Sequence, residues 1–216
     1  VAEKCPLFEE NSTRDEMFKP VTTYADTGIA KNCHGFWTGE YGVQTLGHGG
    51  NTAGCTANIE INPVSGLGIV VMANEPGETA FCHGLPGLLF GDILSRPEYA
   101  SAPVAGGRDL SGIYMMKRTI ASGAFRAASY MGGTFPWASN GDGTYTMKLF
   151  GRAFTARLIS LGENRYVMRD GSMDMFMVDN GETLEMSTSD LVRFSSFWTV
   201  LCFGFIAFGF ICLATL

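Results

Sequence analysis

The stretch Gly47-His48-Gly49-Gly50-Asn51-Thr52-Ala53-Gly54 is the most informative part of this chain. Four of its eight residues are glycine, which weakens a strand because its backbone loses so much conformational freedom on folding. Glycine inside a strand often marks a place where a ligand or another backbone comes close. We therefore expect a glycine-rich edge strand that enters a hairpin, with His48 as a candidate for chemistry. A turn in which His48 is only structural is the alternative.

The residues that follow Gly54 predict two more strands. Residues 55–62 alternate between small and apolar side chains, Pro63-Val-Ser-Gly66 is typical of a turn, and residues 67–73 form a continuous apolar run. Edge strand, strand, turn and strand together indicate an antiparallel meander. His34 and His83 are more typical of hydrogen-bonded structural groups than of catalysts.

The motif His48-Gly49-Gly50-Asn51, with its second strand, its Pro-x-x-Gly turn and Gly68-Ile-Val-Val-Met-Ala-Asn74, resembles the third signature block of the penicillin-recognising serine hydrolases. That group includes class C β-lactamases, low-molecular-weight penicillin-binding proteins, D-aminopeptidases and related esterases. Its third block is usually Lys-Thr-Gly, and a His-x-Gly version is a variant. The resemblance extends over residues 7–94 and implies an α+β fold, with an antiparallel sheet and flanking helices.

The resemblance also implies a role for each residue of the motif. In those enzymes a serine of a Ser-x-x-Lys motif attacks a carbonyl, and the edge strand of the third block pairs with the acyl group of the substrate. Here His48 takes the Lys place, Gly49 the Thr place and Gly50 the Gly place. The backbone N–H of Asn51 is expected to form half of the oxyanion hole. These four residues are the predicted catalytic site.

Two departures from the family pattern change the expected activity. Gly49 has no hydroxyl group, and a histidine in general carries only part of a charge near neutral pH, so the usual grip on a substrate carboxylate is weakened. This argues against a true β-lactamase and leaves D-amino-acid peptidase or esterase activity open. The 216 residues also contain no Ser-x-x-Lys, no Tyr-x-Asn and no Ser-x-Asn. The nucleophile and its base are therefore absent from these residues.

The composition excludes some classes of function. A formal net charge of −6 argues against a nucleic-acid partner, because phosphate binding needs clusters of Lys and Arg that the chain lacks. The six cysteines form no Cys-x-x-Cys, and the chain has no His-Glu-x-x-His, so we expect neither a metal site nor a cofactor. Four cysteines could pair in an oxidising compartment, with a connectivity that their spacing leaves open: Cys5, Cys33, Cys55 and Cys82.

The chain divides into four expected segments. Residues 1–95 are the C-terminal portion of the hydrolase-like domain and end in a helix that begins near Pro86, where proline suits a first turn. Residues 96–108, rich in proline and small side chains, form a linker. Residues 109–193 contain short β-rich runs separated by glycine turns, which predicts an antiparallel barrel or half-barrel that weakly resembles lipocalin-like accessory domains. Residues 194–216 are the fourth segment.

This fourth segment contains no charge and has about the length of a bilayer-spanning helix, roughly 20 residues. A transmembrane helix is therefore expected, with a buried core helix as the alternative. The resemblance implies that residues 1–193 lie on the extracytoplasmic side of the cell membrane. Because the first residue is Val1 and no signal sequence is present, we expect the C-terminal part of a longer protein.

Two functional hypotheses follow. The first is a membrane-anchored serine hydrolase that acts on peptide, amide or ester bonds, whose nucleophile is missing from this chain, so that this segment alone is inactive. Its substrate would be a small molecule or a peptidoglycan-like peptide. The second is a non-catalytic binding or scaffolding protein built on the same fold.

Overall fold

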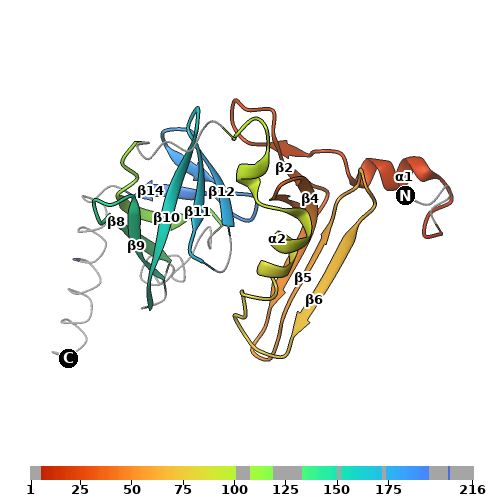
Figure 1. Cartoon of the computed structure of the whole chain (residues 1–216), viewed down its shortest axis with the longest axis horizontal. Coiled ribbons are helices and arrows are strands. Elements are labelled where there is room, and N and C mark those ends of the chain that lie inside the picture. Colours follow the sequence, from red (N-terminus) through yellow and green to blue (C-terminus); the bar gives the residue numbers. More distant parts are fainter. Residues whose placement is uncertain are drawn as a thin grey trace.

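The computed structural model describes residues 6–100, 108–118, 133–149, 152–171 and 174–194, together with residue 204. These residues form an open antiparallel sheet and a closed antiparallel barrel (Figure 1). Helix α2 (Gly84–Phe90) lies between the two in Figure 1, and residues of α2 share a pocket with Arg169 and Asp174 of the barrel.

The sheet is a meander in which each strand pairs with the next along the chain. Turns join the strands, so the spatial order is the sequence order. The register is regular between the last two strands, where Ala57 lies opposite Met72 and Ile59 opposite Val70. The six strands are β1 (Thr22–Thr23), β2 (Ala30–Cys33), β3 (Phe36–Glu40), β4 (Gln44–Asn51), β5 (Thr56–Ile61) and β6 (Gly68–Ala73).

A tight hairpin joins β2 to β3 and determines where β3 begins. Cys33 lies opposite Phe36, which leaves two residues in the loop. Both have positive φ, 42° for His34 and 94° for Gly35. This is the backbone of a two-residue hairpin turn whose twist matches that of the strands. His34 is exposed in that turn, and its role there is conformational.

Three short helical segments accompany the sheet. Helix α1 (Asn11–Met17) precedes it, and α2 and the 3-10 helix η1 (Ile93–Ser95) follow it. Pro86 lies in the first turn of α2, as its tolerance there predicts. Gly91, with φ of 84°, ends α2 after two turns, because that conformation cannot continue a right-handed helix.

The barrel closes on itself, because β9 pairs with both β8 and β10. Its core holds aromatic and methionine side chains, among them Tyr114, Trp137, Met147 and Met177. Closure leaves no unpaired edge in this part of the chain. The strands are β7 (Gly112–Met116), β8 (Thr134–Ser139), β9 (Thr144–Leu149), β10 (Arg152–Gly162), β11 (Arg165–Arg169), β12 (Asp174–Asp179), β13 (Thr183–Glu185) and β14 (Leu191–Phe194).

A second apolar cluster joins the sheet side of the molecule to the barrel. The ring of Tyr24 packs edge-on against that of Phe176, with 5.2 Å between centroids. Val167 of β11 and Ile93 of η1 are also fully buried there. The cluster consists of Tyr24, Ile93, Tyr99, Leu161, Val167, Phe176 and Val178, and we call it the junction core.

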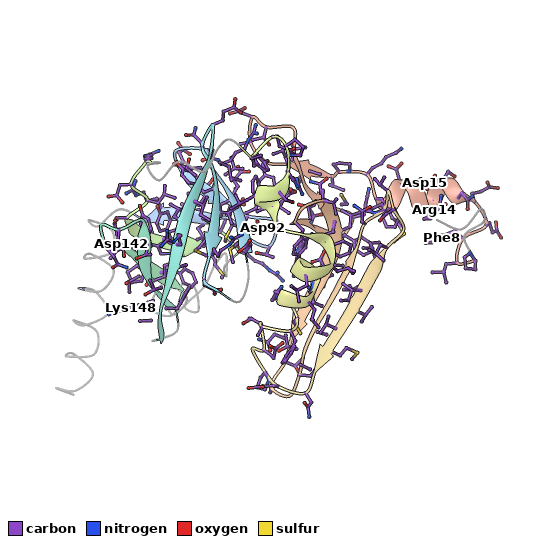
Figure 2. The ribbon with its side chains drawn as sticks, in the orientation of Figure 1. Phe8, Arg14, Asp15, Asp92, Asp142 and Lys148 are labelled. Carbon is purple, nitrogen blue, oxygen red and sulfur yellow. The ribbon has the colours of Figure 1, made fainter. Side chains whose placement is uncertain are left out.

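Ion pairs surround the junction core. The ammonium group of Lys31 on β2 contacts the carboxylates of Asp190 and Glu185, and Glu185 also accepts the N–H of Ala25 at 3.0 Å. On the other side, Arg169 of β11 donates to both carboxylate oxygens of Asp92 at 2.9 Å. Asp92 lies between α2 and the barrel in Figure 2. The sheet and the barrel are thus joined by both apolar and charged contacts.

The structure corrects the expected fold class. An α+β fold is wrong: the protein is mostly β, and the two α-helices described in full have 7 residues each. The helix expected to begin near Pro86 is α2, which begins at Gly84 and is short because Gly84, Gly87 and Gly91 are poor helix formers. A sheet with one short helix, α2, after it takes the place of the sheet with flanking helices that was expected.

Two expected segments lie wholly or partly outside the described residues. Of the predicted linker, residues 101–107 are outside. The transmembrane helix expected over residues 194–216 also lies outside, except for Phe194, which ends β14, and Gly204. In the part of the chain that is described, no helix is long and apolar enough to cross a membrane.

Candidate functional site

The predicted site residues lie together on the second half of β4, and that half has one open edge. β3 pairs with β4 only from Gln44 to Gly47, where Trp37 is the partner of Gly47. From His48 to Asn51, β4 pairs with β5 alone. The strand is therefore interior at its start and an edge at its end. The expectation of an edge strand holds only for the segment 48–51, which we call the open segment.

The register shows which way the backbone groups of the open segment point. Thr52 N–H donates to Cys55 O at 2.8 Å, across the hairpin to β5. Backbone groups of successive strand residues point to opposite sides, so those of Gly49 and Asn51 point away from β5. In the described residues no strand pairs with them there. An extended ligand could take these hydrogen bonds, as strand addition to a sheet edge requires.

The side chain of Asn51 holds the end of the open segment in place. Its Oδ1 accepts the N–H of Gly77 at 3.0 Å, which ties β4 to the loop after β6. Thr56, opposite Asn51 on β5, donates to Glu75 O at 2.8 Å and accepts the N–H of Glu78 at 3.1 Å. The side chain of Asn51 is thus a structural anchor, and its backbone N–H remains the candidate donor.

His48 is exposed, and its imidazole stacks on the indole of Trp37. The two ring centroids are 4.2 Å apart, with 18° between the planes. Trp37 is the first residue of β3 that pairs with β4, and its partner Gly47 immediately precedes the open segment. The nearest atom of Trp37 would be 3.8 Å from a Cβ at Gly49. The indole thus forms one side of the open segment and limits where the imidazole can lie.

A buried carboxyl group lies against β4 on its other face. Glu60 of β5 is 7% exposed, and Thr45 Oγ donates to its Oε2 at 2.6 Å. A Cβ at Gly47 would lie 2.5 Å from this carboxyl group and 2.4 Å from Ile59 O, so only glycine fits there. Burial raises the pKa of Glu60, and the hydrogen bonds from Thr45 and Asn58 reduce that rise.

This carboxyl group lines a small cavity between the sheet and the barrel. The cavity has a volume of about 110 Å³ and reaches Trp37, Gly49 and His83 on the sheet side and Asp174 on the barrel side. Burial lowers the pKa of His83, which favours its neutral form. The walls thus combine ionisable groups with apolar side chains such as Met175 and Phe176, and Gly49 of the open segment forms part of them.

A second buried carboxylate on the same cavity, that of Glu40, is neutralised by a cation. Arg96 contacts Glu40 Oε2 at 2.8 Å and donates to Tyr41 O at 2.7 Å. Burial raises the pKa of Glu40, and the charge of Arg96 opposes that rise. This pair secures the turn between β3 and β4 and has no direct contact with the open segment.

Sequence reasoning brought His48, Gly49, Gly50 and Asn51 together but missed the groups that support them. The hairpin centred on Gly42 fixes which residues of β3 and β4 face each other, so the pairing of Trp37 with Gly47 could have been read from it. A glutamate within the short apolar strand that contains Glu60 was a second signal, because an unpaired charge is costly to bury.

No group of three His, Cys, Asp or Glu residues in the described ranges could hold a metal ion. Cys33 and Cys82 are buried free thiols and Cys55 is an exposed one, while Cys5 is outside these ranges.

Comparisons with known proteins identify no family for this chain. No protein-family model matches the chain, and no curated protein sequence matches it.

Proposed function

We propose that the open segment is one wall of an acyl-transfer site of the type found in the penicillin-recognising serine hydrolases. The observation that carries the proposal is the edge of β4 from His48 to Asn51, which no strand of the described residues covers and toward which the N–H groups of Gly49 and Asn51 point. An edge strand with unpaired donors is what the resemblance in sequence requires at this position.

In the proposed reaction, a serine oxygen forms a bond to the carbonyl carbon of the substrate, and a base takes the serine proton. Asn51 N–H donates to the carbonyl oxygen as that oxygen becomes negative, and one such donor contributes about 3–4 kcal/mol to lowering the barrier. The leaving group departs with a proton, and water then releases the acyl group from the serine. Gly49 pairs with the acyl portion of the substrate, which holds the carbonyl in place.

The substrate class follows from what surrounds the open segment. Glu40, Glu60 and Asp174 line the neighbouring cavity, and no Lys or Arg of the described residues lines it. A substrate carboxylate would therefore meet no described Lys or Arg side chain in this cavity. We place neutral esters and the amide bonds of small peptides ahead of β-lactams as substrates.

The nucleophile and its base come from outside these 216 residues in this proposal, because the sequence has no Ser-x-x-Lys, Tyr-x-Asn or Ser-x-Asn. The second candidate is a binding or scaffolding protein in which the same open edge takes an extended peptide without chemistry. The lack of a nucleophile in the chain favours it. The uncharged run from Phe194 to Leu216 supports a membrane location, and the resemblance supports the extracytoplasmic side.

A fluorophosphonate probe, which labels activated serines, tests the proposal. We expect no labelling of the 216-residue chain and labelling of the complete assembly that contains the nucleophile. His48→Ala in that assembly should lower the turnover of a neutral ester and leave the melting temperature unchanged. His34→Asn is the matched control, because His34 is an exposed imidazole in a turn. Labelling of the isolated chain, or equal turnover in both variants, would contradict the proposal.

A further inference from the structure

One buried carboxyl group between the sheet and the barrel has no cation to balance its charge. Glu60 of β5 is 7% exposed and lines the cavity of about 110 Å³. The two other carboxyl groups of that cavity are paired, Glu40 with Arg96 at 2.8 Å and Asp174 with Arg169. In the part of the chain that the structure describes, no Lys or Arg lines the cavity and none balances Glu60. An uncompensated buried charge is costly, and such departures from good packing are expected chiefly at functional sites.

Glycines on the neighbouring strands leave room for the carboxyl group of Glu60. A Cβ at Gly47 would lie 2.5 Å from Glu60 Oε2, and a Cβ at Gly39 would lie 3.0 Å from the same oxygen. The Cβ at Gly39 would also lie 2.8 Å from Cε2 of Tyr41, so the ring of Tyr41 reaches the same place. Burial, and then the charges of Glu60 and Asp174, raise the pKa of Tyr41, as expected of a phenol close to two carboxylates. Two strand positions are thus kept small around one buried acid.

The rest of the lining supplies what an ammonium group needs besides a carboxylate. Asn58 is 4% exposed and uses its Nδ2 to donate to Cys82 O at 2.9 Å, which leaves its Oδ1 as an acceptor. A Cβ at Gly49 would be 3.7 Å from that oxygen and 3.8 Å from the indole of Trp37, so both adjoin the same space. The face of an aromatic ring attracts a cation, and an amide oxygen accepts its N–H groups. Three aromatic side chains line the cavity: Trp37, Tyr41 and Phe176.

A wider cavity adjoins this one between α2 and the barrel. Its volume is about 450 Å³, and the two cavities share four lining residues: Glu40, Tyr41, His83 and Asp174. Gly87 of α2 lines the wider cavity, and no atom lies within 4 Å of a Cβ added to it. Asp92, which lines it too, is labelled between α2 and the barrel in Figure 2. A ligand can therefore place a charged end beside Glu60 and an uncharged chain along α2.

We propose that the two cavities together bind a small primary alkylammonium ion, with its ammonium group beside Glu60 and Asn58. The N–H groups donate to the carboxylate and to the amide oxygen, and the alkyl chain lies beside Gly87. This site is independent of the proposed function, because it needs no serine nucleophile and because Asn58 and Glu60 project from the face of the sheet opposite to His48. The bound amine supplies the cation that the cavity lacks, and it contacts the sheet and the barrel at once.

The lining favours an amine over a metal ion or a quaternary ammonium ion. A hard cation such as Ca²⁺ takes roughly six to eight oxygen ligands, whereas the described ranges hold no group of three His, Cys, Asp or Glu residues suited to a metal. A quaternary ammonium ion has no N–H group, so it cannot donate to Glu60 or to Asn58. A primary ammonium group offers N–H donors to both and a compact charge to the aromatic rings.

Titration calorimetry of the full chain in a non-ionic detergent tests this site with n-butylammonium chloride, at about pH 8, where carboxyl groups are generally ionised. We expect the wild type to bind the amine. Glu60→Gln keeps the shape of the side chain and removes its charge, so it should bind about tenfold more weakly or worse. Glu75→Gln, which neutralises an exposed carboxylate outside the cavity, is the matched control and should bind as the wild type does.

A second variant and a second measurement keep the test decisive if Glu60→Gln does not fold. Gly87→Leu fills the wider cavity without changing Glu60, and it should also weaken binding by about tenfold or more. Thermal unfolding provides the second measurement, because a ligand of the folded state raises the melting temperature. Sodium chloride at equal ionic strength, and n-butanol, should not raise it. Absence of binding to the wild type, equal affinity in either cavity variant, or an equal effect of sodium chloride would overturn the inference.

Discussion

Gly47 and Gly49 lie two residues apart on β4, yet a side chain at each meets different surroundings. A Cβ at Gly47 would overlap Ile59 O and the carboxyl group of Glu60, whereas the nearest atom to a Cβ at Gly49 is 3.6 Å away. Gly47→Ala should therefore destabilise the protein by roughly 1–3 kcal/mol, the usual cost of overpacking. Gly49→Ala should change stability by less than about 0.5 kcal/mol. Thermal unfolding measures both, and equal losses would show that the close approach at Gly47 is wrong.

Glu60 should make stability depend on pH. Burial raises its pKa in the folded protein above the ordinary value of 4.5. Its contribution to stability is therefore complete below pH 4.5 and is lost as the pH rises through the folded-state pKa. Glutamine stays neutral, so Glu60→Gln should melt higher than the wild type above that pKa, and the difference should narrow as the pH falls toward 4.5.

Glu78 is the control for this pH series, because its pKa shifts in the opposite direction. Backbone N–H groups, that of Phe81 first, hold the pKa of Glu78 below its ordinary value. Glu78→Gln should therefore lower the melting temperature at neutral pH, and this deficit should shrink as the pH falls below 4.5 and through the lower folded-state pKa. A Glu60→Gln difference that stays constant with pH would contradict the assignment.

The residues of the open segment could be identified from the sequence, but the side chains that pack against the segment could not. The glycines around His48 were visible as an unusual strand, and the resemblance supplied roles for them. The stacked ring of Trp37 and the buried carboxyl group of Glu60 depend on pairing between strands, which one sequence reveals only when the hairpin register is worked out. The departure at Gly49 was visible, whereas the ample space around it was not.

The β2–β3 hairpin offers a test of a single element. Gly35 has φ of 94°, and no atom lies within 4 Å of an added Cβ. Backbone strain is therefore the only reason for Gly35→Ala to lower stability. We expect a loss of roughly 1–2 kcal/mol, the usual cost of a left-handed conformation for a residue with a side chain. Gly50→Ala is the control, since Gly50 has ordinary φ and open space around it. Chemical denaturation would show a loss only in the first variant, and equal losses would contradict the turn.

Strands and turns of residues 1–95 could be predicted, because the sequence patterns that indicate them span only a few neighbouring residues. Alternation and a Pro-x-x-Gly turn located β5 and β6, and Pro86 located the first turn of α2. The end of α2 at Phe90 was not predicted, because it depends on the positive φ of Gly91. The prediction that β4 is an edge strand holds for its second half only, because β3 begins to pair with β4 at Trp37, opposite Gly47.

Lys31 tests whether sheet and barrel unfold together. Its side chain is 14% exposed and contacts Glu185 and Asp190, which are 12% and 15% exposed. Lys31→Met leaves two partly buried carboxylates without their cation, so we expect a loss of roughly 3 kcal/mol and a single, lower calorimetric transition. Lys19→Met, which breaks an exposed pair with Glu16, should leave the melting temperature unchanged. Two separate transitions would contradict a shared core.

The junction core could not be predicted from the sequence, because its residues come from segments that are far apart along the chain. Tyr24 follows β1 and Phe176 lies within β12, and nothing in the sequence around either one indicates the other. The β-rich character of residues 109–193 was visible as recurring glycine turns, but complete closure depends on β9 meeting β10 and β14 meeting β7. The fold class was misjudged for a related reason: the helices of the resembled family were assumed, while this chain has two short ones in its described part.

Because Tyr24, Ile93 and Tyr99 share one apolar interior with Val167 and Phe176, the stretch 101–107 does not connect two independent modules. A protease site engineered into that stretch would cut the chain without releasing either piece. Both fragments would leave a gel-filtration column as one particle and would part only in denaturant. A barrel produced alone would expose half of that interior and precipitate, so shortened versions of this protein should keep both pieces.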